Sequence, residues 1–233
     1  MSAKIIIENY EGRHNNDGRY EAWSKLGLYR NLSTVLVCPT RGTCSTRVAF
    51  SWMNLMGGFN APLVKMCIEG YEVGEAYNQA LIQILTNDVF KTFQYVLCLE
   101  EDNTVMPDSL IKLYQGIEKY DVLSGLYWLK GPDGCPQIWG DPSKPNDYTP
   151  QPIGNERYQE CNGTGQGFTL MRLDIFKNPG FEFGKWFRTK NDQGQAITQD
   201  LYFARRAKEL GYRFAVDTHC KIGHLDLNEG TIW

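Results

Sequence analysis

The stretch 97-LCLEEDNTVMPDSL-110 decides how the rest of the chain is interpreted. An apolar run ends abruptly in Glu100, Glu101 and Asp102, and Pro107 follows at a position that suits the first turn of a helix. In an extended chain residues i and i+2 point to the same side, so the carboxylates of Glu100 and Asp102 are expected to converge. They would repel each other, and a hard divalent cation such as Mg²⁺ or Mn²⁺ is one physical answer to that repulsion. A solvated acidic turn that precedes the helix is the competing interpretation.

Strand-like and helix-like segments alternate on both sides of this stretch. Apolar runs predict buried strands at 34–38, 62–68, 94–99 and 121–129, and further strands at 167–176, 212–217 and 222–224. Apolar periodicity predicts helices over about 45–56, 75–85, 107–117 and 198–210. This alternation predicts an α/β fold with a mostly parallel, Rossmann-like central sheet flanked by helices. Residues 131–160 are rich in Gly, Pro, Asp and Asn, which predicts a small loop-rich region of functional importance.

Length, charge and cysteine spacing exclude several classes of protein. A chain of 233 residues can bury one substantial core, so a single domain is expected. The net charge of −3 weighs against an extended surface that tracks nucleic-acid phosphates. The seven cysteines include no C-x-x-C pair, which favours reduced thiols and a cytoplasmic protein. No apolar segment is long enough to span a bilayer.

Several segments resemble, in the same order, the motifs of glycosyltransferases of the GT-A fold, in particular family-2-like transferases that carry a D-x-D motif. Glu100 stands in place of the first aspartate of that motif, and Asp102 in place of the last. The other similar segments are 37-VCPTRG-42, 74-GEAYNQAL-81, 163-GTGQGFTLMR-172, 198-TQDLYFARRAKELGY-212 and 223-GH-224. The resemblance therefore implies a GT-A-like sheet over most of the chain.

The resemblance also implies an activity and a metal site. It implies a metal-dependent transferase that uses a nucleoside-diphosphate sugar, with UDP as the favoured nucleotide. Glu100, Asp102 and His224 are the implied ligands of Mn²⁺ or Mg²⁺, and His219 competes with His224. Asp200 is the implied general base that deprotonates the acceptor hydroxyl, in a transfer that inverts the anomeric configuration; a retaining course stays open. The structural alternative for Asp200 is an acid that simply favours the first turn of a helix.

The same resemblance places the donor nucleotide at the ends of the first strands. The implied contacts with the nucleotide sugar are Pro39, Thr40, Arg41, Glu69, Asn78 and Glu101. Among them Arg41 is the natural charge partner of a diphosphate. Proline and glycine are equally typical of a plain surface turn, so that interpretation stays open as well.

Residues 33–130 are then expected to form the nucleotide-sugar-binding half, and 131–233 the acceptor-binding half, of one domain. Residues 1–32 form an N-terminal extension of unknown role. The acceptor stays open between a glycan, a protein, a lipid-linked sugar and a modified nucleic-acid base, and the oligomeric state is not predicted. Two other functions also stay open: a nucleotidyltransferase that releases pyrophosphate, and a non-catalytic module of the same fold that binds a sugar nucleotide or a glycan.

Overall fold

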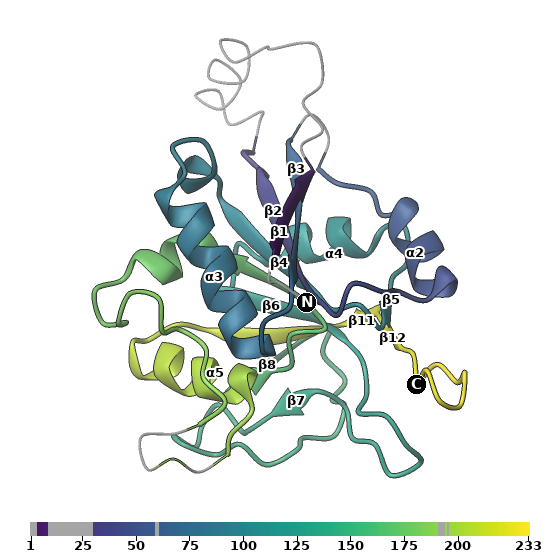
Figure 1. The fold of residues 1–233 in the computed structure, drawn as a ribbon. Coiled ribbons are helices and arrows are strands. Elements are labelled where there is room, and N and C mark those ends of the chain that lie inside the picture. Colours follow the sequence, from purple (N-terminus) through teal and green to yellow (C-terminus); the bar gives the residue numbers. More distant parts are fainter. Residues whose placement is uncertain (1–3, 9–29, 59–60, 191–193, 195) are drawn as a thin grey trace.

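The computed structural model describes residues 4–8, 30–58, 61–190, 194 and 196–233, and for residues 4–8 it describes the backbone alone. Within these residues the chain forms an eight-stranded sheet with helices on both faces (Figure 1). The strands, in spatial order, are β1 (Lys4–Glu8), β3 (Leu63–Glu69), β2 (Thr34–Thr40), β4 (Tyr95–Leu99), β10 (Phe168–Arg172), β6 (Val122–Leu126), β11 (Phe214–Lys221) and β8 (Tyr158–Cys161).

The strand directions confirm the predicted mostly parallel, Rossmann-like α/β sheet. Strands β3, β2, β4, β6 and β11 run in one direction. Strands β1, β10 and β8 run in the other, each antiparallel to its neighbours. The sequence predicts a strand at 167–176, but its apolar pattern does not distinguish an antiparallel strand inserted between β4 and β6. The final turn of that segment is instead the 3₁₀ helix η2 (Leu173–Lys177).

The predicted helices are confirmed with slightly shifted ends, as α2 (Thr46–Met53), α3 (Val73–Thr86), α4 (Ser109–Gly116) and α5 (Gln199–Glu209). A further 3₁₀ helix, η1 (Phe90–Thr92), precedes β4. Alternate residues of the central strands feed two buried clusters, one under α3 and α5 and the other beside α2 and α4 (Figure 1). This is the period-two alternation of a sheet that is covered on both faces.

Two small strand pairs lie outside the large sheet. In the loop-rich region β7 (Ile138–Trp139) pairs antiparallel with β9 (Gly163–Thr164). Near the C-terminus β12 (Gly223–His224) pairs antiparallel with β5 (Asn103–Thr104), directly after the acidic stretch.

The predicted N-terminal extension is in part a component of the sheet, because β1 pairs antiparallel with β3. Residues 9–29 of that extension lie outside the described residues. None of the helices in the described part of the chain has the length and apolar content needed to cross a bilayer. The seven cysteines are free thiols.

Candidate active site at the acidic strand tip

The carboxyl ends of β2, β3 and β4 meet at one edge of the sheet, where open α/β sheets bind ligands. Thr40 pairs with Glu69 at the last register position of β2 and β3, and Glu100 directly follows β4. The backbone N–H of Glu100 donates to the carbonyl of Gly167 at 3.1 Å, and the N–H of Asn103 donates to the carbonyl of Glu100 at 3.0 Å. These two bonds turn the chain sharply at the tip, so that the acids project from the end of the strand.

Asp102 and His224 come from distant parts of the chain and face each other. The pairing of β5 with β12 places them together, and Nε2 of His224 lies 3.5 Å from Oδ2 of Asp102. Nδ1 of His224 lies 2.8 Å from the carbonyl oxygen of Trp128. A carbonyl oxygen can only accept, so Nδ1 carries a proton. A hydrogen bond to the Asp102 carboxylate requires a second proton on Nε2, and loss of that proton gives the neutral tautomer whose Nε2 lone pair can bind a cation. This tautomer suits a histidine that ligates a cation through Nε2.

Lys130 is a functional candidate that the sequence does not single out. Its Nζ donates to the same Oδ2 of Asp102 at 2.5 Å. Burial raises the pKa of Asp102, but the hydrogen bonds with His224 and Lys130 outweigh that effect and lower the pKa to about 2. Asp102 is therefore ionised at neutral pH. The available signal was the place of Lys130 just beyond the end of β6, at the same edge of the sheet as the tip.

Glu100 is electrostatically different from Asp102. It is partly buried, and the hydroxyl of Tyr77 donates to its Oε1 at 3.2 Å. Burial, and then the nearby charges of Asp102 and Asp200, raise the pKa of Glu100 to about 7. Near neutral pH the Glu100 carboxyl is thus poised to lose its proton when positive charge arrives beside it.

Asp200 lies in the first turn of α5, as predicted. Burial raises the pKa of its carboxyl, and the N–H of Leu201, which donates to Oδ1 at 2.8 Å, acts in the opposite direction. The charge of Asp200 acts on Glu100 and on the phenol of Tyr127, so the N-terminus of α5 faces the tip. A partly desolvated carboxylate at this position can accept a proton from a hydroxyl group.

Glu101 and the turn after β2 form one bonded unit. The Thr40 hydroxyl and the Arg41 N–H donate to Oε2 of Glu101 at 2.7 and 2.9 Å, and the Arg41 guanidinium forms an ion pair with Oε1. Gly42, with φ of +91°, lies so close to Glu69 that an added Cβ would be 2.7 Å from Oε1 of that side chain. Glu101 therefore fixes the turn and orients Arg41, whose side chain is 72% exposed.

Three other residues named from the sequence are Asn78, Pro39 and His219. Asn78 is buried in α3, where its Nδ2 donates to the carbonyl of Phe187 at 2.8 Å and its Oδ1 accepts from the Phe187 N–H at 3.0 Å. This pairing accounts for the Asn78 amide through packing alone. Pro39 is partly buried within β2. His219 is exposed on β11, whereas His224 is the histidine that lies beside Asp102.

Buried polar atoms gather around the glycine-rich segment below the tip. An added Cβ on Gly165 or Gly167 would meet the side chain of Tyr127, whose hydroxyl accepts from the Gly167 N–H at 2.8 Å. Four buried atoms close to this segment have no hydrogen-bond partner among the described residues: Asn103 Oδ1, Gln137 Nε2, Thr164 Oγ1 and Gln166 Oε1. Buried polar atoms require partners, which ordered water or the hydroxyl groups of a ligand can supply.

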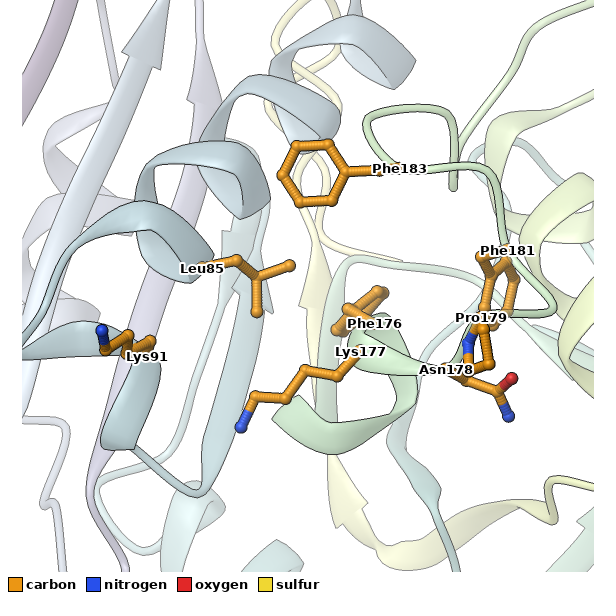
Figure 2. Close-up of a pocket in the computed structure, with 8 residues that line it drawn as sticks. All are labelled: Leu85, Lys91, Phe176, Lys177, Asn178, Pro179, Phe181 and Phe183. Atoms are coloured by element: carbon orange, nitrogen blue, oxygen red, sulfur yellow. The ribbon is translucent and has the colours of Figure 1, made fainter.

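A separate cavity of about 480 Å³ lies at the opposite end of β4, where η1 precedes that strand and η2 follows the antiparallel β10. Figure 2 shows its lining: Leu85, Lys91, Phe176, Lys177, Asn178, Pro179, Phe181 and Phe183. Apolar and aromatic side chains predominate there, and the two lysine ammonium groups pair with Asp88 and Asp174. The chemistry of the acidic tip therefore belongs to a different part of the molecule.

The residues at the tip fit a divalent cation in their donor chemistry. A carboxylate oxygen of Asp102 and the imidazole nitrogen of His224 converge, and this pair suits Mn²⁺ in particular. Glu100 lies close enough for its pKa to be raised by Asp102. Within the described residues, no three potential ligand side chains are already gathered in positions to hold a metal ion.

Comparisons with known proteins bear on the fold. The chain is similar to the crystal structure of A197 from STIV, with a TM-score of 0.60, 18% identity, and coverage of 86% of this chain and 92% of that chain. It is also similar to the crystal structure of S. aureus TarS 1-349, with a TM-score of 0.48, 15% identity, and coverage of 82% of this chain and 59% of that chain. The likeness to A197 establishes a shared fold. No family model and no curated protein matches the sequence.

Proposed function

We propose that the chain is a metal-dependent glycosyltransferase that moves a sugar from a nucleoside-diphosphate sugar to a hydroxyl acceptor. The single observation that carries this proposal is the Asp102–His224 pair. An imidazole whose Nδ1 is bonded to a carbonyl presents its Nε2 to an ionised carboxylate at the carboxyl edge of the sheet. The fold resembles the GT-A type, whose D-x-D motif lies at the same strand end, and UDP is the nucleotide proposed on that resemblance.

Each residue at the tip has a proposed role. Asp102 and His224 hold Mn²⁺ or Mg²⁺, and Glu100 joins them as it loses its proton. When bound, the cation would offset the negative charge that grows on the departing diphosphate. Arg41, oriented by Glu101, adds positive charge beside the phosphates. Thr40, Pro39 and Glu69 line the same edge next to the nucleotide.

Asp200 accepts the proton of the acceptor hydroxyl as that oxygen attacks the anomeric carbon. Its raised pKa favours proton transfer at neutral pH. Attack on the face opposite to the departing diphosphate inverts the anomeric configuration. The orphan polar atoms near Gly165 and Gly167 are proposed partners for sugar hydroxyl groups.

The test is a thermal-shift screen of UDP- and GDP-sugars with and without Mn²⁺. We expect stabilisation that requires nucleotide and metal together, by about 2–3 kcal/mol at a ligand concentration of 100 times Kd. Asp102→Asn should abolish this synergy, whereas Asp88→Asn, at a carboxylate that is 92% exposed and remote from the tip, should keep it. Synergy that survives in Asp102→Asn would contradict the proposal.

Product analysis separates the proposed function from its alternatives. Release of the nucleoside diphosphate identifies a glycosyltransferase, whereas release of pyrophosphate identifies a nucleotidyltransferase. Binding without release of either product, across a panel of glycan, protein and lipid-linked acceptors, would favour a non-catalytic module. Hydroxylated DNA belongs in the same panel as an acceptor.

A further inference from the structure

Two basic side chains near the acidic strand tip form ion pairs with its carboxylates. Arg41 pairs with Glu101, and Lys130 pairs with Asp102. The two pairs differ in their surroundings, because the Arg41 side chain is 72% exposed and that of Lys130 is 31% exposed. Only Lys130 sits on the carboxylate that, in the proposed function, ligates the divalent cation.

The loop that carries Lys130 also positions His224. Trp128 forms an antiparallel bridge with Pro136, and the Leu129 N–H donates to the Cys135 carbonyl at 2.9 Å, so the loop is pinned on both sides of its turn. From this loop the Trp128 carbonyl accepts from His224. One short segment therefore fixes the imidazole and delivers an ammonium group to the same carboxylate.

The Lys130 ammonium and a divalent cation would compete for the same oxygen of Asp102. The Nζ of Lys130 is 2.5 Å from Oδ2, and Nε2 of His224 approaches that same oxygen at 3.5 Å. An ammonium and a divalent cation that shared this oxygen would repel each other strongly in a partly buried site. The lysine side chain is a flexible stem of four carbons, so the ammonium can leave Asp102 without any change in the backbone.

We propose that Lys130 neutralises Asp102 in the free protein and moves onto the donor's diphosphate when a divalent cation takes its place. This inference rests on the proposed function and identifies Lys130 as a residue that binds the diphosphate. The partly buried Asp102 carboxylate then has a positive partner in both states. In addition to Arg41, the diphosphate then has the Lys130 ammonium as a positive partner.

The test compares Lys130→Met with wild type in two binding measurements. Mn²⁺ affinity is measured without nucleotide, from the EPR signal of free Mn²⁺, and UDP affinity is measured by calorimetry at saturating Mn²⁺. We expect Lys130→Met to bind Mn²⁺ about tenfold more tightly, since a competing positive charge is gone. We expect it to bind UDP about tenfold more weakly, since a charge-assisted contact is gone. A merely structural role would weaken both.

Two further variants serve as controls for Lys130→Met. Lys91→Met removes another carboxylate-paired lysine, at the opposite end of β4, and should change neither affinity. Lys130→Arg keeps the charge and should restore most of the UDP affinity. Because Lys130 is partly exposed, the unfolding midpoint of Lys130→Met should stay close to that of wild type, which circular dichroism checks.

The outcomes separate the two proposals. Unchanged or weaker Mn²⁺ binding by Lys130→Met, in a protein whose wild type binds Mn²⁺ and UDP together, overturns the role of Lys130 and leaves the proposed function standing. Absence of Mn²⁺ and UDP binding in both wild type and Lys130→Met overturns the proposed function, and the role of Lys130 with it. Tighter Mn²⁺ binding together with weaker UDP binding by Lys130→Met supports both proposals.

Discussion

Neighbouring acids at the tip of β4 have acquired opposite properties from their surroundings. Asp102 is held ionised by an ammonium and an imidazole, with a pKa lowered to about 2. Glu100, two residues earlier, is packed against the phenol of Tyr77, and its pKa is raised to about 7. The pair thus offers a cation one permanent charge and one charge that appears on binding. Such a site accepts a divalent ion without holding two uncompensated charges beforehand.

The raised pKa of Glu100 predicts that this residue lowers the free energy of unfolding at high pH. Its pKa is raised from 4.5 to about 7 on folding, so the folded state keeps a proton that the unfolded state releases. Stability is therefore lost as the pH rises through that window, and the loss is complete above pH 7. We expect Glu100→Gln to raise the free energy of unfolding at pH 8 by roughly 2 kcal/mol, and by much less at pH 5.

Urea denaturation at the two pH values measures this effect. Glu118→Gln, at a carboxylate that is 61% exposed, is the matched control and should shift neither value appreciably. Equal changes at pH 5 and pH 8 in Glu100→Gln would show that the Glu100 carboxyl is not buried in the way described here.

Asp200 carries the second prediction at this scale. Asp200→Asn should lower the rate of sugar transfer by about 10²- to 10⁴-fold, since the proposed general base is lost, and should leave Mn²⁺–UDP affinity unchanged. Asp174→Asn, which alters another first-turn acid that is 84% exposed, should transfer sugar at the wild-type rate. A parallel loss of UDP affinity in Asp200→Asn would assign Asp200 to donor binding. Steady-state kinetics and calorimetry together decide between the two roles.

At the scale of elements, a two-residue strand decides where the histidine lies. The pairing of β12 with β5 places His224 opposite Asn103, and the bond from Leu225 N–H to the Asp102 carbonyl, at 2.8 Å, extends that pairing past the acid. The pairing requires close approach at Gly223. An added Cβ there would be 2.3 Å from Thr104 Oγ1 and 2.4 Å from a methyl carbon of Ile232.

Gly223→Ala should therefore displace β12 from β5. We expect a loss of stability of about 1–3 kcal/mol from overpacking, and a fall in Mn²⁺ affinity of about tenfold as His224 moves away from Asp102. Gly154→Ala is the control, because its added Cβ would have its nearest contact at 3.4 Å. Unchanged Mn²⁺ affinity in a measurably destabilised Gly223→Ala protein would separate His224 from the cation.

At the scale of the whole molecule, the two halves of the chain are interleaved. Strand β10, from the expected acceptor-binding half, lies between β4 and β6 of the expected nucleotide-binding half. The tip has the same character, since Asp102 and Lys130 precede residue 131 while Asp200 and His224 follow it. The two halves therefore share one sheet, and the proposed site draws residues from both.

A fragment of residues 1–130 tests this interleaving. It keeps β4 and β6 but lacks the strand that joins them, so we expect no cooperative urea transition and no native-like near-ultraviolet dichroism. The full-length chain, measured alongside, should show a single transition. A sharp transition in the fragment would instead make the first half an independent domain.

The sequence was sufficient for those features that depend on local pattern. Apolar runs that end at Pro39, Gly70 and the acidic stretch located the strands on one side of the sheet. Because the carboxyl ends of parallel strands meet at one edge, the position of the acidic tip also followed from the sequence. It was insufficient where long-range pairing decides. Strand direction leaves no mark in a short buried run, so the antiparallel course of β10 was not predicted. The contact of Lys130 with Asp102 was not predicted, because it depends on how the loop after Leu126 packs against the end of β4, which a local pattern does not specify.

Diffraction from crystals grown with Mn²⁺ and UDP, recorded at a wavelength where manganese scatters anomalously, would locate both the cation and the nucleotide. We expect one strong anomalous peak between the Asp102 carboxylate and Nε2 of His224, with the diphosphate beside it. A nucleotide bound elsewhere on the molecule, with no manganese peak at this pair, would contradict it.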